Sequence, residues 1–142
     1  MPKGKKKFVL TKGKKKTAVA RVRIKEGHGL VRVNGRLLAH ISPELVRQII
    51  YEPLMLAEDF LGPEFVTSID IMANVQGGGI MGQAQATRTA IGKALVEFGG
   101  GEKLRKRYLE YDRTMLVDDV RKKESKKYLR KGARAKPIKS YR

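Results

Sequence analysis

The sequence contains no cysteine and only two histidines, His28 and His40. Without cysteine the chain has no disulfide, no thiolate nucleophile and no thiolate ligand for zinc. Two histidines twelve positions apart supply few ligands for a metal ion, and we interpret each as a loop or surface residue. We therefore expect no metal and no cofactor.

Long apolar runs are also missing. No stretch reaches the roughly 18 apolar residues of a transmembrane helix, and the N-terminal MPKGKKK lacks the apolar core of a secretory signal. We expect a cytoplasmic protein without a membrane partner. Its 142 residues, 41% of them hydrophobic, are enough for one domain with a modest core.

Acidic residues are almost absent from the two ends of the chain. Residues 1–16 carry eight lysines and no acid, and residues 121–142 carry eleven Lys or Arg against the single Glu124. The remaining segment, 17–120, has 13 basic and 13 acidic residues. We predict a neutral globular domain over 17–120, a basic N-terminal arm over 1–16 and a basic C-terminal tail over 121–142, both arms solvated on their own.

This charge distribution points to a polyanionic partner. Lysine and arginine at such density suit a phosphate polymer, because binding releases its condensed counterions. A membrane surface or an acidic protein is the less favoured alternative, since the sequence has no aromatic-rich amphipathic basic helix of the membrane-binding kind.

Alternation of apolar and polar residues predicts the strands. Segment 17–25 places four apolar side chains on one face and Arg21, Arg23 and Lys25 mostly on the other. A second strand is predicted over 30–35, ending in the tight-turn pair Asn34-Gly35 with positive φ. Segment 65–75 is predicted as the central strand, segment 114–120 is a candidate for a last one, and 36–41 is too short to classify.

Helical periodicity begins after Ser42, which we expect to cap a helix that has Pro43 at its first position. Pro53 is expected to end or kink this helix, and the periodic pattern continues to Gly62-Pro63. The predicted core residues of this region are Leu45, Val46, Ile49 and Ile50.

Two more helices follow the central strand. Segment 80–98 is predicted to be helical, closed by the glycines 99–101, and segment 102–111 to be a shorter amphipathic helix. Expected inward residues are Ile80, Ala84, Ile91, Leu95 and Phe98 in the first, and Leu104, Tyr108 and Tyr111 in the second. The order of elements predicts an α/β (α+β) two-layer sandwich of one sheet and one helical layer.

The glycines at 77–79 open the stretch GGGIMGQAQATRTAIGKAL. A phosphate-binding P-loop is excluded, because Gly82 is followed by Gln83 and Ala84 in place of Lys and Ser or Thr. A dinucleotide fingerprint lacks the acidic residue expected about twenty positions on. Two interpretations stay open: a helix N-terminus that accepts any phosphate, and a tight corner that lets helix pack on strand.

No catalytic constellation is present. Asp118-Asp119 and Glu58-Asp59 are adjacent pairs, so their side chains point to different faces of a helix or strand, and neither pair has a histidine or glycine loop beside it. We interpret both pairs as surface charge and expect the protein not to be an enzyme.

Four stretches resemble the small-subunit ribosomal protein nine family: GKKKTAVARV (13–22), GLVRVNGR (29–36), the segment 77–95 and the ending KGARAKPIKSYR (131–142). The terminal Ser-Tyr-Arg is similar to the archaeal and eukaryotic branch. The resemblance implies a ribosomal S-five domain-two-like fold with one left-handed strand-helix-strand crossover. It also implies a place in the head of the small subunit, beside neighbouring head proteins.

The resemblance further implies contact with small-subunit rRNA and with the anticodon stem-loop of P-site tRNA. The tRNA-contacting residues it implies are Arg142, Tyr141, Ser140 and Lys139. Specificity for rRNA is expected to come mainly from RNA shape. The rRNA-binding candidates are Lys14, Lys15, Lys16, Arg21, Arg23, Lys25, Gly77, Gly78, Gly79, Gln83, Arg88, Lys93, Lys103, Arg105, Lys106, Arg107, Arg121, Lys122, Lys123, Lys126, Lys127, Arg130, Lys131, Arg134 and Lys136.

Two functions from other classes are weighed against this one. A DNA-compacting protein would use the same cationic arms, and a phosphotransferase would use the glycine corner. Glu124 interrupts an otherwise basic tail and places local contacts there in question.

Overall fold

The computed structural model describes residues 8–135. The predicted rRNA contact Lys136 and the predicted tRNA contacts Lys139, Ser140, Tyr141 and Arg142 lie outside these residues. The elements in chain order are the strands β1 (Phe8–Lys15), β2 (Ala18–Glu26), β3 (Val31–Val33), β4 (Arg36–Leu37) and β5 (Ile69–Gln76), the helices α1 (Glu44–Leu61), α2 (Pro63–Thr67), α3 (Ile80–Leu95) and α4 (Gly101–Tyr111), the 3-10 helices η1 (Leu38–His40) and η3 (Arg113–Met115), and the π-helical turn η2 (Val96–Gly100).

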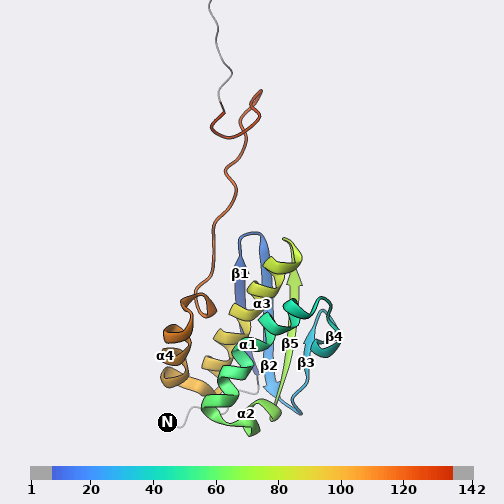
Figure 1. Ribbon diagram of the computed structural model, residues 1–142, viewed down its shortest axis with the longest axis vertical. Coiled ribbons are helices and arrows are strands. Elements are labelled where there is room, and N and C mark those ends of the chain that lie inside the picture. Colours follow the sequence, from blue (N-terminus) through green and yellow to red (C-terminus); the bar gives the residue numbers. More distant parts are fainter. Residues whose placement is uncertain (1–7, 136–142) are drawn as a thin grey trace, which may run out of the picture.

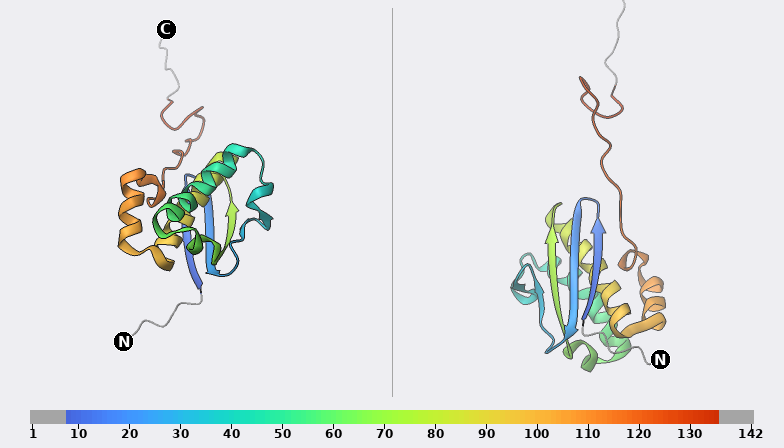
Figure 2. Two further views of the ribbon diagram at one scale, coloured as in Figure 1. Left: turned by 60° about the horizontal axis from the view of Figure 1, so that its bottom comes forward. Right: turned by 180° about the vertical axis from the view of Figure 1, so that it is seen from behind.

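The five strands form one sheet in the order β1-β2-β5-β3-β4. β3 and β5 are parallel, and the other neighbours are antiparallel. The helices lie on one side of this sheet (Figure 1). Seen from behind, the strands stand in front with no helix over them (Figure 2, right). The fold is therefore a mixed α/β arrangement with one covered and one open face of the sheet.

The buried face of the sheet follows the predicted alternation. In β2 the side chains of Ala18, Ala20, Val22 and Ile24 are fully buried. Alternate residues of β5 are likewise buried beneath the helices. Because successive side chains of a strand point to opposite faces, every residue between these positions is directed to the open face.

The first strand differs from the predicted N-terminal arm. The lysine run predicts that residues 1–16 lie outside the fold, yet Phe8–Lys15 pairs with β2 along its whole length. Val9 is buried, and the backbone at Gly13 lies so close to α3 that a Cβ there would be 2.2 Å from the Ala86 carbonyl oxygen. The lysines conceal this strand, because pairing with β2 and packing against α3 act through Val9, Thr11 and Gly13, which the charge run does not show.

The predicted turn at Asn34-Gly35 is confirmed, and both residues have positive φ, of 49° and 82°. It joins β3 to the two-residue strand β4. The Asn34 side chain accepts a hydrogen bond from the Val75 amide at 2.8 Å and donates one to the Val75 carbonyl at 3.2 Å. This side chain ties the hairpin to β5.

The first helix begins one residue later than predicted. Pro43 takes the N-cap position, with extended backbone and no capping side-chain hydrogen bond, so the expected Ser42 cap is wrong. The helix passes through Pro53, which is buried, as one continuous element. Val46 and Ile50 are buried as predicted, Ile49 is half-buried, and Leu45 is exposed.

The predicted start of the central strand at residue 65 is wrong. Residues 63–67 form α2, with Pro63 in its first turn, and β5 begins at Ile69. The Thr67 hydroxyl donates to the Pro63 carbonyl at 3.1 Å, and the Phe65 ring packs against Phe98. The proline at the start of α2, the Thr67 hydrogen bond and this aromatic contact outweigh the period-two pattern that Phe65 and Thr67 continue.

The helices after β5 differ from prediction at their ends. Segment 80–98 divides into α3 and η2, and α4 follows at once from Gly101, whose φ is 55°. Ile80 and Tyr111, both expected inward, are exposed. Tyr108 is fully buried and donates to the Pro53 carbonyl at 2.6 Å, which joins α4 to α1.

Segment 114–120 is not a strand. Arg113–Met115 is a 3-10 helix capped by Asp112, whose side chain accepts from the Thr114 amide. Only one bridge joins this described segment to the sheet, between Lys15 and Asp119. Met115 is fully buried, and its carbonyl oxygen lies where a side chain at Gly92 would stand, so packing of this residue against α3 holds the segment predicted as a strand.

Candidate nucleic-acid interface

The open face of the sheet gathers cations from three strands. Arg21 and Arg23 project from β2 as predicted and are exposed. The register places Lys12 of β1 opposite Arg21. Arg32 of β3 lies opposite Met72 of β5, which in turn lies opposite Arg23. Four cations thus share one uncovered surface that no helix of the described chain shields.

Apolar side chains lie between these cations. Leu10 and Met72 are 64% and 43% exposed, and together with Arg21, Arg23 and Arg32 they line a shallow groove of about 410 Å³. The Arg23 guanidinium carbon stands 5.0 Å from the centre of the Phe8 ring. On such a surface the cations can bind phosphates, and the apolar side chains can contact sugars or the faces of bases.

Lys25, also predicted to contact rRNA, is partly compensated within the fold. Its ammonium lies 3.7 Å from Asp70. Asp70 accepts hydrogen bonds from the backbone amides of His28 and Leu30, and these amides, with the nearby charge of Lys25, hold the pKa of its carboxyl below the usual value. Asp70 organises the β2–β3 turn and reduces the charge that Lys25 offers.

The glycine corner is closely packed at Gly77 and Gly78 and open at Gly79. A Cβ at Gly77 would lie 2.6 Å from the Thr17 carbonyl oxygen, and one at Gly78 would lie 3.0 Å from the Ala18 Cβ. Gly79 is the N-cap of α3, makes no side-chain capping bond, and has open space where a side chain would stand. The tight-corner interpretation holds at the first two glycines, while the helix N-terminus at the third is accessible.

Gln83, a predicted rRNA contact, makes a hydrogen bond within the glycine corner. Its side-chain amide donates to the Gly77 carbonyl at 3.1 Å. The side chain therefore closes the corner from within the first turn of α3.

Arg88 contacts carboxylates of its own chain. Its side chain is only 11% exposed; Nη2 lies 2.8 Å from Asp112 and Nη1 donates to Thr114 at 3.0 Å. Nε lies 2.6 Å from Glu52 at an angle that is not that of a hydrogen bond. This ion network joins α1, α3 and the segment before η3, so Arg88, a predicted rRNA contact, has partners within its own chain.

The environment of Asp112 shows how this network is held. Burial alone raises the pKa of its carboxyl, but hydrogen bonds from Thr114 and Arg88 outweigh burial and lower it. Tyr111 has its pKa raised, first by its hydrogen bond to Glu52 and by the charge of that carboxylate.

Asp118 and Asp119, predicted as simple surface charge, contact three segments of the chain: β1, α3 and the residue Arg121 that follows them. Asp118 lies 2.7 Å from the Lys93 ammonium and accepts from the Lys14 amide. Asp119 lies 3.2 Å from Lys15 and pairs with Arg121 through two nitrogens, at 2.9 and 2.7 Å.

These two carboxylates attach the start of the C-terminal segment to β1 and α3. The guanidinium of Arg121 holds the pKa of the Asp119 carboxyl far below its usual range, and the same contact raises the pKa of Arg121. Lys15, Lys93 and Arg121 are therefore partly neutralised, whereas Lys14 is half-buried and Lys16 is exposed.

Two further groups of predicted cations lie on exposed surfaces. The α4 residues Lys103, Arg105, Lys106 and Arg107 are exposed. Residues 121–135 extend away from the globular part (Figure 1). Arg134 pairs with Glu124 at 3.1 Å, so this acid has an internal partner. The other exposed or half-exposed tail cations in the described range are Lys122, Lys123, Lys126, Lys127, Arg130 and Lys131.

Two cations of the open face are absent from the sequence-based candidates. Lys12 falls within the predicted arm, and Arg32 is not singled out. The alternation Val31-Arg32-Val33 carries the same signal as β2 and identifies Arg32 as outward once the strand is accepted. Lys12 becomes a sheet residue only when Phe8–Lys15 is recognised as a strand.

Within residues 8–135 no three His, Cys, Asp or Glu side chains are grouped so that they could hold a metal ion. The same part of the chain contains no helix with the length and apolar character needed to cross a membrane.

Comparison with known proteins places this arrangement in a class of ribosomal proteins. Residues 13–142 match the family model described as Ribosomal protein S9/S16, and the chain belongs to this family. It is accordingly a ribosomal structural protein and not an enzyme.

Among its relatives is the small ribosomal subunit protein uS9 of Methanothrix thermoacetophila. The two are 47% identical over 136 residues, which cover 96% of this chain and 99% of the relative. The family resemblance seen in the four sequence stretches is thereby confirmed.

Proposed function

We propose that this protein is a structural component of the small ribosomal subunit, located in its head and so in the cytoplasm, where it binds small-subunit rRNA. The observation that carries the proposal is the uncovered sheet face with Lys12, Arg21, Arg23 and Arg32, in a chain 47% identical to a small-subunit protein. Phosphate contacts from such a face fix position and orientation, and they select RNA by shape.

The fold supports this assignment. We propose the ribosomal S-five domain-two-like type. In Figure 1 the helices lie in front of the sheet, β5 points upward, and the chain passes from β3 on the right through α1 to β5 on the left. For the parallel pair β3 and β5 this is the left-handed sense, opposite to the usual preference.

The contact surface extends beyond the sheet. The open N-terminus of α3 at Gly79 offers backbone amides and a positive helix end to a phosphate. The α4 cations and residues 121–135 add exposed charge. In the proposed division, the globular domain ends near residue 120 and the basic segment 121–142 is neutralised by rRNA phosphates on assembly.

The C-terminal residues are proposed to reach P-site tRNA. Segment 121–135 leaves the globular domain from the Asp118-Asp119 anchor and extends away from it (Figure 1). Lys139, Ser140, Tyr141 and Arg142 come after this segment in the sequence. A terminal arginine suits this role, because its planar guanidinium donates two hydrogen bonds to one phosphate.

Binding across a salt series tests the rRNA role. The full-length chain is titrated with folded small-subunit rRNA and with duplex DNA of equal length between 50 and 200 mM salt, roughly the range over which phosphate-mediated affinity falls most steeply. Preference for the rRNA at every salt concentration supports the proposal. Equal affinities would favour the DNA-compacting alternative.

Removal of Ser140–Arg142 tests the tRNA role. Small subunits assembled with the shortened chain are expected to form normally and to release P-site tRNA faster than subunits with the full chain. Replacement of Arg142 by Lys serves as the control that keeps the charge. Unchanged tRNA release from the shortened form would contradict this role.

A further inference from the structure

The outer face of α1 is acidic in an otherwise cationic protein. Segment 44–67, which contains α1 and α2, carries five carboxylates and one guanidinium. Successive turns of α1 place Glu44, Gln48, Tyr51, Met55 and Glu58 along one stripe, since residues three and four apart lie on the same side of a helix. This stripe lies opposite the buried residues Val46, Ile50, Leu54 and Ala57.

The same stripe exposes apolar side chains. Tyr51 is 41% and Met55 is 44% exposed. The Tyr51 hydroxyl donates to both carboxylate oxygens of Glu58, at 2.9 and 3.0 Å, which holds the ring across the helix surface. A phosphate backbone has no complement here, because it would meet carboxylates and bury apolar carbon.

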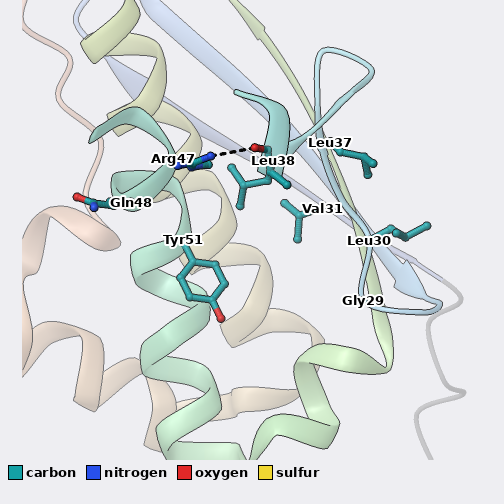
Figure 3. Close-up of a pocket in the computed structure, with 9 residues that line it drawn as sticks. Gly29, Leu30, Val31, Leu37, Leu38, Arg47, Gln48 and Tyr51 are labelled. Carbon is teal, nitrogen blue, oxygen red and sulfur yellow. Dashed lines mark hydrogen bonds between the residues drawn. The ribbon is translucent and has the colours of Figure 1, made fainter. Parts of the chain in front are cut away.

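An apolar pocket adjoins this stripe. It has a volume of about 530 Å³ and lies between α1 and the β3–η1 segment. Figure 3 shows Tyr51 and Gln48 on the α1 side and Leu30, Val31, Leu37 and Leu38 across from them. Arg47 closes one end by donating to the Ala39 carbonyl at 2.9 Å and lies 3.8 Å from Glu44, so the pocket's single charged lining residue is engaged.

We infer that the α1 stripe and its apolar pocket form a docking surface for a basic segment of a neighbouring protein, which inserts an apolar side chain beside Tyr51 and places lysine or arginine against Glu44, Glu58 and Asp59. Charge complementarity selects this occupant. RNA is repelled by the carboxylates, and a second copy would bring the same acidic stripe against itself. This inference rests on the proposed function, since it assigns the opposite layer of the molecule to protein contact.

Photo-crosslinking from two methionines tests the assignment. Met55 on the α1 stripe and Met72 on the open sheet face are 44% and 43% exposed, so each reports on its own face with equal access. Each is replaced by p-benzoylphenylalanine in the full chain, and small subunits isolated from cells that express the variant are irradiated. Crosslinks are identified by mass spectrometry.

The expected products differ between the two sites. Position 55 crosslinks to a protein segment with an excess of lysine and arginine and at least one large apolar residue, and position 72 crosslinks to rRNA. The docking surface is overturned if position 55 yields rRNA, a second copy, an acidic segment or no product. Absence of the chain from small subunits overturns the proposed function and this inference together. A basic protein at position 55 without rRNA at position 72 removes only the proposed rRNA face.

Charge reversal supplies the second measurement. Glu44→Lys with Asp59→Lys is expected to lower the crosslink yield at position 55 by about fivefold or more, because attractive pairs become repulsive. The matched control, Glu102→Lys with Glu110→Lys, makes the same change in net charge on exposed residues of α4 and should leave the yield unchanged. An equal loss in both variants would overturn the inference, and circular dichroism of each variant reports its folding.

Discussion

Arg88 shows that one buried cation can decide how three segments meet. Its guanidinium faces Glu52 of α1 and Asp112 before η3, while its own backbone belongs to α3. A buried charge is stabilising only while its partners are in place. In this structure Arg88 joins three segments. The sequence alone shows a basic residue within a predicted helix and does not distinguish such an internal contact from an exposed one.

Replacing Arg88 by methionine should strongly destabilise the fold. The substitution keeps apolar volume but leaves two carboxylates without their partner. We expect a loss of about 2–3 kcal/mol in the free energy of unfolding, below the full cost of breaking a buried pair because the carboxylates are partly hydrated. Urea unfolding measures it. Arg105→Met on exposed α4 is the control, expected to change stability by less than about 0.5 kcal/mol; equal effects would contradict the network.

Acid should weaken this network through Asp112. The pKa of Asp112 in the folded state is lower than its ordinary value of 3.8. A carboxyl with a lowered folded pKa contributes stability that is complete above the unfolded pKa and is lost as pH falls through the folded one. Asp112→Asn should therefore melt at lower temperature than the wild type at neutral pH, and the difference should shrink below pH 3.8. Parallel melting curves from pH 5 to 2 would exclude this contribution.

At the scale of elements, β1 is the feature that composition conceals. Eight lysines precede residue 17, and net charge predicts a solvated arm. Strand pairing and the approach of α3 at Gly13 act on the uncharged positions between the lysines. A charge run and a strand are compatible when each cation is exposed, as Lys12 is, or has a carboxylate partner, as Lys15 has in Asp119.

Substitution of Gly13 by alanine tests whether β1 is part of the fold in solution. The added methyl group would meet the backbone of α3, at 2.2 Å from the Ala86 oxygen and 2.6 Å from the Ala90 nitrogen. We expect a loss of about 1–3 kcal/mol, the range for overpacking, measured by urea unfolding. Gly79→Ala has open space around it and should cost only about 0.5 kcal/mol, because alanine is a poorer N-cap of α3 than glycine. A neutral Gly13→Ala would indicate that β1 detaches from α3.

The elements that could be predicted share strong periodicity. Apolar spacing identifies β2, α1 and α4, and the Asn-Gly pair identifies the β3–β4 turn. The failures lie where local chemistry competes with pattern: α2 in place of the start of β5, η2 within a predicted helix, and η3 with a two-carboxylate anchor in place of a strand. Tertiary contacts such as Phe65 with Phe98 decide these cases, and they are invisible in a linear pattern.

At the scale of the whole molecule, the neutral charge of segment 17–120 hides a separation of charge between two layers. The open sheet face carries Arg21, Arg23 and Arg32, whereas the outer face of α1 carries Glu44, Glu58 and Asp59. Counting charges along the chain cannot show this, because residues from distant positions share each face. The sequence thus predicts that the candidate site consists of basic residues, but it identifies only some of the residues that belong to it.

The three arginines of the sheet should set the salt dependence of rRNA binding. Replacing Arg21, Arg23 and Arg32 together by glutamine is expected to reduce the slope of log affinity against log salt by about three, because each arginine neutralises one phosphate. The triple lysine variant keeps the charge and should retain the slope. Filter binding at several salt concentrations measures both, and an unchanged slope in the glutamine variant would place the RNA elsewhere.

The attachment of Arg121 through Asp119, which itself holds Lys15, has a geometric consequence. Because Arg121 is fixed to the globular domain, the number of residues after it limits how far from the domain the chain can extend. Each residue inserted or deleted between 122 and 135 would shift the chain beyond it by up to about 3.5 Å. The distance that the C-terminus can reach therefore depends on the number of residues between 122 and 135, whatever their composition.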